Sequence, residues 1–459
     1  MMSPITIIII AVAILMIYPI LILTYNVYNY LTYRRRGIRD NIAECSNGFK
    51  TLSVIIPTWH EPLSSVVDAV ERALNLNWLG PIEVIVVSDD DEDYVNELKR
   101  RVNSLGDNVK VLRRINKNAG KAGALDYGFR HSRGDYVLTM DVDSLIDPNF
   151  PPKACGLMSK SNVAAVAGRW YGYNTDTLVS EAVTASMNLA VDTIQGGRRA
   201  RGLPALVVGT GTMFKASVLR EVDGWSGSGP QDDIYVWLKL ISRGFDVGFI
   251  DGKVVGVENP RTYSVFKFQQ SKWAYGVADA LRRMMGRLMR SNISTRVKFD
   301  AVLLLTQYIT PALFIVSSLI IGVTSLFLSG FIGLATLPLL ILYGSLALAY
   351  GYIPLRTGSG GLTPYSAGRS SAMVMAMSMQ VLYSYIKGSL GLSFRGWDVT
   401  PKGRLIVIKA LPIETIMMIT FTVLLILNLI HGYLSSALWV AVGDASYIYV
   451  HYRFAKEII

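Results

Sequence analysis

The chain has 459 residues, so more than one structural unit is expected. Hydrophobic residues make up 51% of it, and the mean hydropathy of +0.35 is high for a soluble protein. The net charge of +11 would suit a nucleic-acid-binding protein, but many basic residues stand beside apolar segments, so nucleic acid is not expected as a partner. With Cys45 and Cys155 as the only cysteines, neither a disulfide framework nor a cysteine-rich metal site is expected.

The first predicted element is a transmembrane helix, assigned to residues 1–33. The apolar run from Ile5 to Leu31 is long enough to cross a bilayer, which takes ~20 residues. Arg34, Arg35 and Arg36 follow it, no basic residue precedes it, and no small-residue cleavage site comes after it. These flanks favour a retained helix over a signal peptide. The positive-inside rule then places the N-terminus outside the plasma membrane and Arg34 onward in the cytoplasm.

Residues 50–255 alternate between strand and helix patterns. Strands are predicted in "LSVIIPTW", "IEVIVVSDD", "NVKVLRRI" and "DYVLTMDVD", with a helix between each strand and the next. This alternation predicts an α/β domain with a mostly parallel sheet, in which ligands bind beyond the carboxyl ends of the strands. Acidic residues follow three of these strands: Glu61, residues 89–91, and the pair Asp141 and Asp143. We expect the three strand ends to converge on one crevice.

These polar residues also have plainer interpretations. Asp89 or Asp90 could simply cap the helix that follows, and a D-x-D pair is common by chance. Asp141 and Asp143, however, lie two apart on a strand, so they share a face and repel each other unless a cation lies between them. "NAGKAGAL", with Lys121 at a helix start, resembles a phosphate loop but lacks the P-loop spacing, and it could be only a glycine-rich start of a helix.

The C-terminal part returns to membrane patterns. Residues 256–298 are expected to form amphipathic interface helices, because arginines alternate with methionines and leucines over residues 282–290. Two pairs of transmembrane helices are expected in residues 299–355 and 403–452. Between the pairs, Ser371–Leu392 is Met-rich and has basic residues on both flanks, which favours a helix lying in the interface. The five predicted spans are Ile5–Leu31, Ala301–Leu328, Phe331–Leu355, Leu411–Ile430 and Tyr433–Val450, with the C-terminus inside.

Several motifs, taken in order, resemble a known family. "VIIPTWHE", "EVIVVSDD", "KNAGKAGALDYG" and "DVD" resemble the donor half of family 2 glycosyltransferases, whose nucleotide-diphospho-sugar transferase fold is called GT-A. "VVGTGTMFKASVLREVDGW" resembles the acceptor-side segment of that family, and "QDDIYVWLKLISRGFDVGF" resembles the segment with the catalytic acid. "QQSKWAYG" resembles the Q-x-x-R-W signature, and "WDVTPKG" resembles the F-x-V-T-x-K gating loop of cellulose synthase and hyaluronan synthase-like enzymes.

The resemblance covers about residues 50–402. It implies a GT-A domain inserted between the transmembrane helices of a polytopic α-helical membrane protein, with an interface helix and gating loop in residues 371–402. The chain departs from the family pattern in two residues. The signature arginine is Lys272, which keeps the charge but lacks the planar fork that grips a diphosphate. The gating-loop phenylalanine is Trp397, which can still stack on a base.

The resemblance also implies the roles of single residues. Asp143 would bind Mg²⁺ or Mn²⁺ together with the diphosphate of a nucleotide sugar, and Asp141 would lie nearer the ribose. Asp89 and Glu61 would recognise the nucleoside. The full implied donor-binding set is Pro57, Glu61, Asp89, Lys121, Asp141, Lys272, Trp397, Thr400 and Lys402, and the implied acceptor-binding set is Gly211, Asp232, Gln269 and Trp273.

Asp233 is the candidate catalytic base, because it matches the second acid of the family motif. A positioned carboxylate can take the proton of an acceptor hydroxyl while that hydroxyl attacks the sugar. Asp232 precedes it, so one of the pair could cap a helix while the other reacts, or both could be ordinary acids at a helix start. Trp273 would stack on the acceptor sugar, although it could also be an interfacial aromatic anchor.

The implied function is a membrane-bound, metal-dependent, inverting glycosyltransferase. It would transfer a sugar from a nucleotide sugar, expected to be UDP-linked, to a growing β-linked polysaccharide, and could export the product. A non-processive enzyme that glycosylates a membrane lipid is the first alternative. A decayed scaffold or transporter is the second, and the retained acids at positions 89, 141, 143 and 233 argue against it. The expected partners are the nucleotide sugar, a polysaccharide or lipid-linked acceptor, and the bilayer.

Overall fold

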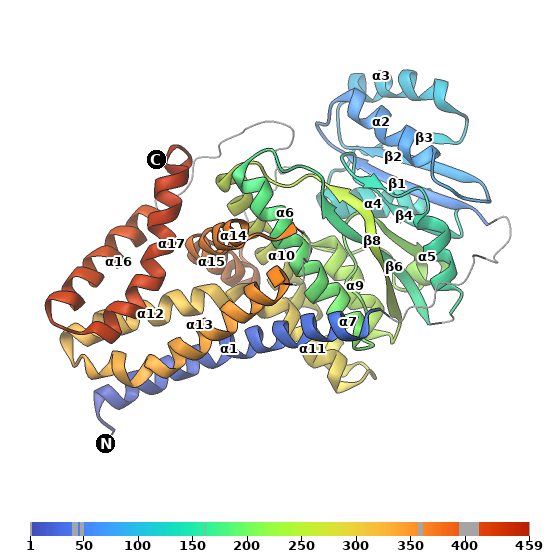
Figure 1. The fold of residues 1–459 in the computed structure, drawn as a ribbon. Helices are drawn as coiled ribbons and strands as arrows, with labels where there is room; N and C mark the ends of the chain where they lie inside the picture. The colour runs from blue at the N-terminus through green and yellow to red at the C-terminus, as the bar shows by residue number, and fades with distance from the viewer. Residues whose placement is uncertain are drawn as a thin grey trace.

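The computed structural model describes residues 2–38, 45, 50–160, 162–356, 361–393 and 413–458. Its soluble part is built on an eight-stranded sheet with the order β3-β2-β1-β4-β7-β6-β8-β5 (Figure 1). The strands are β1 Leu52–Thr58, β2 Ile82–Ser88, β3 Val109–Arg113, β4 Tyr136–Thr139, β5 Leu145–Ile146, β6 Val163–Gly172, β7 Thr212–Lys215 and β8 Asp246–Val257. Strands β1 to β4 run parallel, as predicted, whereas β7 lies antiparallel to both β4 and β6.

Helices cover both faces of this sheet, which confirms the predicted α/β architecture. They are α2 Leu63–Leu74, α3 Glu92–Val102, α4 Gly120–Arg130, α5 Phe150–Met158, α6 Leu178–Val191, α7 Gly197–Ala200, α8 Ala216–Glu221 and α9 Asp232–Ser242, with short turns η1 Asn103–Leu105 and η2 Asp192–Gly196. Successive strand residues enter opposite cores: Ile55 and Ile85 pack with α4 and α9, and Val54 and Val84 pack with α2, α3 and α5. The near-continuous apolar strands therefore suit burial on both sides.

The remaining helices form a bundle on one side of the domain (Figure 1). They are α1 Pro4–Arg36, α10 Tyr263–Arg290, α11 Thr295–Thr306, α12 Thr310–Phe327, α13 Phe331–Arg356, α14 Pro364–Ala376, α15 Ser378–Leu390, α16 Ile413–Ile430 and α17 Leu434–Ile458, with a 3₁₀ turn, η3, over Gln307–Ile309. Helices α10, α14 and α15 lie between the domain and the outer part of the bundle (Figure 1). The interface segment predicted over Ser371–Leu392 is thus two helices, which meet at Met377.

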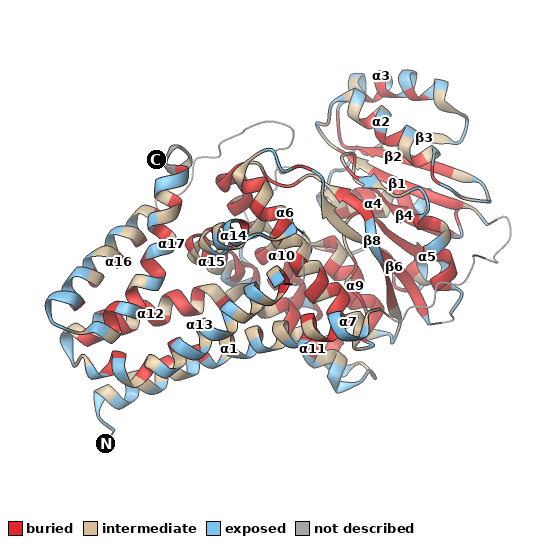
Figure 2. Cartoon of the chain, in the orientation of Figure 1, coloured by how far each residue is buried: buried red, intermediate tan, exposed pale blue. Residues whose placement is uncertain are grey.

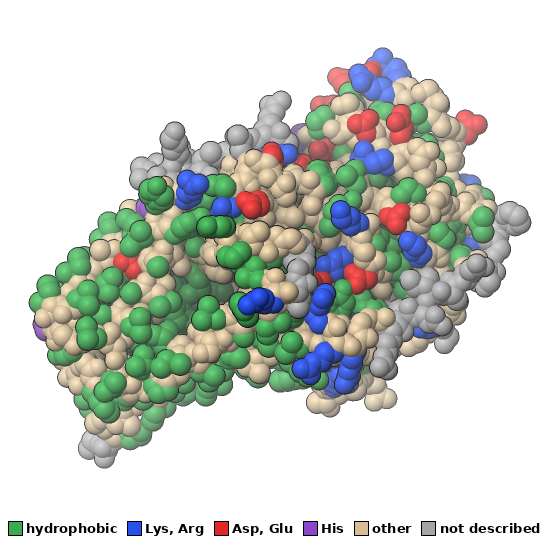
Figure 3. Space-filling view, in the orientation of Figure 1, with side chains coloured by type: hydrophobic (Ala, Val, Ile, Leu, Met, Phe, Trp, Pro, Cys, Tyr) green, Lys and Arg blue, Asp and Glu red, His purple; other side chains and the backbone are tan. Residues whose placement is uncertain are grey.

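Four helical stretches of the described residues are long and apolar enough to cross a membrane: Pro4–Arg36, Thr295–Phe327, Phe331–Arg356 and Ile413–Ile430. Large apolar side chains on the bundle surface are exposed, including Ile14, Leu348 and Ile430 (Figures 2 and 3). The fifth predicted span lies in α17, which packs against α16 but whose hydropathy is lowered by serines and Asp444. The five-span topology and the outside N-terminus stay predictions.

Helix α1 is fastened to the domain at its C-terminal end. The hydroxyl of Tyr33 donates a hydrogen bond of 2.5 Å to Asp251 on β8. Two glycines of the domain let α1 approach closely: a Cβ at Gly196 would lie 2.7 Å from the Tyr33 ring, and one at Gly197 would lie 2.7 Å from Asn29. Any side chain at these two positions would push α1 away from the domain.

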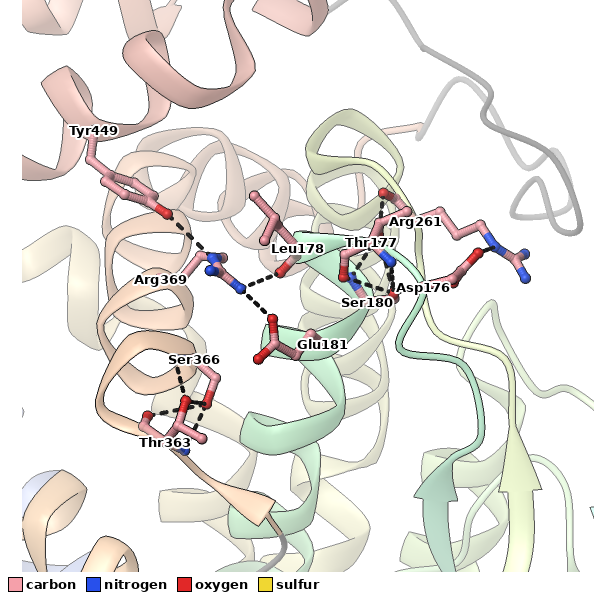
Figure 4. A network of polar contacts seen from close by, with 10 residues as sticks. All are labelled: Asp176, Thr177, Leu178, Ser180, Glu181, Arg261, Thr363, Ser366, Arg369 and Tyr449. Atoms are coloured by element: carbon pink, nitrogen blue, oxygen red, sulfur yellow. Dashed lines mark hydrogen bonds and ion pairs between the residues drawn. The ribbon is translucent and has the colours of Figure 1, made fainter.

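A second connection between the domain and the bundle runs through α14. Arg369 of α14 forms an ion pair of 2.7 Å with Glu181 of α6 and donates to the carbonyl of Leu178 (Figure 4). Its Nε also donates to the hydroxyl of Tyr449 on α17, at 3.3 Å. One guanidinium therefore holds together three helices that are far apart in the sequence.

A disulfide joins Cys45 to Cys155, which corrects the expectation that the two cysteines form no such bond. Their Cα atoms are 5.3 Å apart, although 110 positions separate them in the sequence. Cys155 is fully buried on α5, beneath β4. The bridge ties Cys45, which lies between α1 and β1 in the sequence, to α5. Sequence spacing alone could not reveal this pairing, because it depends on how the sheet folds.

We expect the disulfide to stabilise the protein against heat. Opening a closed loop of about this length removes an entropic stabilisation of ~4–5 kcal/mol. Purified protein melted with and without dithiothreitol should show a lower Tm when reduced. The variant Cys45→Ser/Cys155→Ala should melt near the reduced parent in both buffers. If the oxidised parent and this variant had the same Tm, the bridge would contribute nothing to stability.

Candidate active site

The carboxyl ends of β1, β2 and β4 lie at one edge of the sheet, at the place of the predicted crevice. The amide of Asp89, after β2, donates to the carbonyl of Thr58 at the end of β1. The amide of Gly211 donates to the carbonyl of Thr139 at the end of β4, which brings the predicted acceptor-side segment to the same edge. The structure therefore brings the three acidic strand ends close to one another, as the strand pattern predicted.

Asp89 is buried and paired with Arg114, a residue that the sequence analysis missed. The Nε and Nη2 of Arg114 donate to the two carboxylate oxygens of Asp89 at 2.8 and 2.5 Å. The same guanidinium donates to the carbonyls of Asn118 and Gly120, at the start of α4. Arg114 thus fixes Asp89 and the glycine-rich turn relative to each other. A basic residue at the end of β3, next to the acids that follow β2, is the signal that could have identified it.

The capping interpretation of Asp89 and Asp90 is wrong, because Asp91 caps α3. Its Oδ1 accepts a hydrogen bond of 2.9 Å from the amide of Tyr94. Asp90 is buried and instead accepts from the amide of His60, at 2.8 Å. His60 has a positive φ of 57°, so this carboxylate stabilises a strained turn after β1.

Glu61 and Pro57 lie along the same edge of the crevice. Glu61 follows the strained turn, and its carbonyl accepts a hydrogen bond of 2.7 Å from the hydroxyl of Tyr94. Pro57 is half-buried in β1, opposite Val87 of β2. Their roles in donor binding stay predictions.

Lys121 lies among the acids at this edge of the sheet. Its Nζ is 2.6 Å from a carboxylate oxygen of Asp141 and 3.2 Å from the carbonyl of Gly209. Burial works against the charge of Lys121, but the nearby carboxylates, Asp141 first, outweigh it and raise the pKa of the ammonium group. The charge of Asp141 is therefore balanced by a lysine. The amide of Asp141 donates to the hydroxyl of Thr210, which holds the D-x-D turn against the Gly209 loop.

Asp143, two residues after Asp141, is half-buried. Burial, and after it the charge of Asp143, raises the pKa of Tyr173, so the tyrosine lies near this carboxylate. Within the described residues, no three His, Cys, Asp or Glu side chains are grouped as a protein-only metal site. Two carboxylates fit a Mg²⁺ or Mn²⁺ ion that takes its other oxygen ligands from a diphosphate and water.

Asp232 and Asp233 begin α9, across the Gly209 loop from Lys121. A Cβ built on Gly209 would lie 3.3 Å from the Nζ of Lys121 and 3.6 Å from an oxygen of Asp233. Burial and then the charge of Asp232 raise the pKa of Asp233 to about 7. Burial also raises the pKa of Asp232, and the positive charges of Lys121 and Lys272 oppose that shift.

The two acids of α9 differ in their contacts. Asp233 accepts a hydrogen bond from the amide of Ile234, at 2.8 Å. One oxygen of Asp232 is buried and accepts no hydrogen bond from the described residues. The sequence left open which acid caps the helix; the N-cap residue is Gln231, which makes no side-chain capping bond, and of the two acids Asp233 bonds an amide of the first turn.

The remaining predicted site residues are Gly211 and three residues of α10. Gln269, Lys272 and Trp273 are half-buried on α10, and Lys272 is close enough to Asp232 to influence its pKa. Gly211 has a φ of +72°, and a Cβ there would lie 2.3 Å from Val255, so this position requires glycine for packing. The three predicted gating-loop residues, Trp397, Thr400 and Lys402, lie outside the described residues.

Comparisons with known proteins identify the family and the fold of the chain. The family model described as glycosyl transferase family 2 matches residues 53–223. A probable glycosyltransferase from Sulfolobus acidocaldarius is 30% identical over 464 residues, which cover 97% of this chain and 98% of the relative. Glucomannan 4-beta-mannosyltransferase 7 from Arabidopsis thaliana is 27% identical over 57% of this chain, which spans about half (49%) of that longer protein.

One solved structure resembles most of the chain. A mannosyltransferase from Pyrobaculum calidifontis, solved with GDP-Man and Mn²⁺, has a TM-score of 0.53 and 16% sequence identity. The match covers 84% of this chain and 98% of that one. At this level of identity the likeness concerns the fold, and it confirms the predicted GT-A architecture.

We expect Arg114 to be required for nucleotide binding. Arg114→Lys keeps one charge but loses the fork that bonds both oxygens of Asp89 and the Gly120 turn. Hydrogen bonds to charged groups contribute ~1.5–3 kcal/mol each, so the Kd for UDP or GDP with Mn²⁺ should rise ~10-fold or more. Isothermal titration calorimetry measures this Kd. Arg113→Lys is the matched control, because Arg113 pairs with Glu92 on the surface; equal affinities for both variants would contradict the role of Arg114.

Proposed function

Because the chain belongs to glycosyl transferase family 2, we propose that it is a membrane-bound inverting enzyme that transfers a sugar from a nucleotide diphosphate sugar to an acceptor hydroxyl. The observation that carries this proposal is the pair of opposed groups across the Gly209 loop. Asp233, with a pKa of about 7, faces Lys121, which in turn pairs with Asp141 of the D-x-D turn. A base and a cation on two sides of one gap suit a displacement at a sugar carbon.

On the donor side, the residues provide oxygen and ammonium groups for a nucleotide diphosphate. Asp89, held by Arg114, would accept hydrogen bonds from the nucleoside. Asp143 and Asp141 would hold Mg²⁺ or Mn²⁺, which neutralises charge on a leaving diphosphate. Lys121 and Lys272 would add two positive charges at the diphosphate, where charge grows as the bond to the sugar breaks.

On the acceptor side, Asp233 would remove the proton from the attacking hydroxyl. A carboxylate of ordinary pKa is a weak base at neutral pH, whereas a pKa near the working pH suits proton transfer. Burial is the main cause of the raised pKa of Asp233; the negative charge of Asp232 raises it further, and the positive charge of Lys121 opposes the shift. Attack from the face opposite the diphosphate would invert the configuration of the sugar carbon.

The proposal also specifies a donor and an acceptor. We favour a UDP-sugar donor and a growing β-linked polysaccharide, with the apolar helices crossing the plasma membrane and the GT-A domain in the cytoplasm. The name of the Arabidopsis relative makes a mannosyl donor such as GDP-mannose the second candidate. A lipid-linked acceptor also fits, since the domain lies directly against the bundle (Figure 1).

Nucleotide release from a panel of donors tests the proposed activity. Purified protein in nanodiscs, supplied with Mn²⁺, should release nucleotide from one of UDP-glucose, UDP-N-acetylglucosamine, UDP-glucuronate or GDP-mannose. Excess EDTA and the variant Asp143→Asn should each abolish this release, because both remove the ion that stabilises the leaving diphosphate. Full turnover in EDTA would rule out the metal, and no release from any donor would contradict the transferase proposal.

A separate experiment tests the base. Asp233→Asn should lower kcat for transfer by ~10²–10⁴-fold while the Kd for nucleotide stays near that of the parent. Because the base must be deprotonated, kcat of the parent should fall as the pH drops below about 7. Asp232→Asn is the matched control and should keep a measurable rate. A dead Asp232→Asn enzyme beside a near-normal Asp233→Asn enzyme would assign the role to Asp232 instead.

A further inference from the structure

A buried ion pair connects α10 to the start of α16. The Nζ of Lys267 lies 2.7 Å from an oxygen of Glu414, and the two side chains are 8% and 0% exposed. The hydroxyl of Tyr263, one turn earlier on α10, donates to the same oxygen at 3.1 Å. The Tyr263 ring stacks on Phe454 of α17 with 5.7 Å between centroids. Three helices therefore meet at one carboxylate.

This pair is expensive to bury, and packing alone does not require it. Removing two charges from water costs several kcal/mol for each ion, and well-packed apolar residues often serve as well or better. The second oxygen of Glu414 is buried and accepts no hydrogen bond from the described residues, so the carboxylate is not fully satisfied. An acid at a helix start is favourable on the surface, but this one faces another helix. Such a pair is best explained by the position in which it holds α10 relative to α16.

The opposite face of α10 contacts the candidate active site. Gly276 lies nine residues after Lys267, which is half a turn around a helix of 3.6 residues per turn. A Cβ on Gly276 would lie 2.8 Å from Gln231, the residue just before the two acids of α9. Asp279 of α10 also accepts a hydrogen bond of 2.8 Å from Tyr235 of α9. Lys272 lies on α10 between Lys267, which contacts the bundle, and Gly276, which contacts Gln231.

We propose that the Lys267–Glu414 pair is a positioning contact that sets α10 against the bundle and thereby places Lys272 and the start of α9. The reaction that it serves rests on the proposed function. Helix α10 acts as a rigid rod with the bundle on one side and the catalytic acids on the other. A shift of α16 against the domain is then transmitted to Lys272, Asp232 and Asp233, so the bundle and the active site are mechanically coupled.

Single and paired substitutions in the full chain, reconstituted in nanodiscs, test this coupling. Lys267→Met and Glu414→Gln each remove one charge and keep the size of the side chain. Both variants should fold, because α15 also packs closely on α10 at Gly388. Measured well below Tm, each should lower kcat for transfer at least ~10-fold, since small displacements of catalytic groups have effects of this size. The reversed pair Lys267→Glu/Glu414→Lys should recover most of the loss.

Thr422→Val is the matched control. It breaks a hydrogen bond of 3.0 Å between α16 and α17, from Thr422 to Asp444, without touching α10. Its kcat should equal that of the parent. If the Lys267 and Glu414 variants lose only Tm while kcat and the donor KM of the folded enzyme stay unchanged, the pair is structural and the proposal fails. A reversed pair that restores Tm but not kcat would also overturn it.

Hydrogen exchange separates this proposal from the proposed function, because it requires no activity. The two single variants should exchange faster in residues 264–276 of α10 and at the start of α9, and the reversed pair should restore protection. Unchanged exchange in both single variants would overturn the positioning role even if the protein proved to be an active transferase. Faster exchange in a protein that releases no nucleotide from any donor would support the coupling and reject the transferase.

Discussion

The ammonium group of Lys121 is the charge around which the crevice is arranged. It pairs directly with Asp141, and its field reaches both acids at the start of α9. Without that positive charge, three carboxylates from two separate segments would repel one another in a partly buried space. With it, the D-x-D turn and the start of α9 can face each other across Gly209. The proposed donor and acceptor sides are therefore held together by the same group that would meet the diphosphate.

The parts of this arrangement that follow from local chemistry could be predicted from the sequence. Alternating strand and helix patterns determine a parallel sheet, and the carboxyl ends of parallel strands must meet at one edge. That reasoning brings Asp89, Asp141 and Asp143 together without a structure. The choice of "QDDIYVWLKL" as the segment with the candidate base came only from the family resemblance, because a pair of acids at a helix start is common in any protein.

The parts that depend on distant pairings could not be predicted. The position of Arg114 at the end of β3 indicates a contact with the acids after β2, but it does not indicate which acid Arg114 bonds. A cation was expected between Asp141 and Asp143, and in the structure a lysine pairs with Asp141. Arg282 and Arg283 were interpreted as contacts to anionic lipid, yet both donate to the buried Asp279. Hydropathy identified the apolar helices well, but it did not predict the break at Met377 or the polar character of α17.

The attachment of α1 to the domain has a consequence for the lipid environment. A helix of 33 residues is ~50 Å long, whereas the hydrocarbon core of a bilayer is ~30 Å thick. In the proposed topology the last turns of α1 would therefore project beyond the lipid, where Gly196, Gly197 and Tyr33 fasten them to the domain. A thicker membrane would draw this rod inward or tilt it, and the domain would move with it. In the proposed topology, membrane thickness thus becomes a variable that sets the height of the candidate active site above the lipid surface.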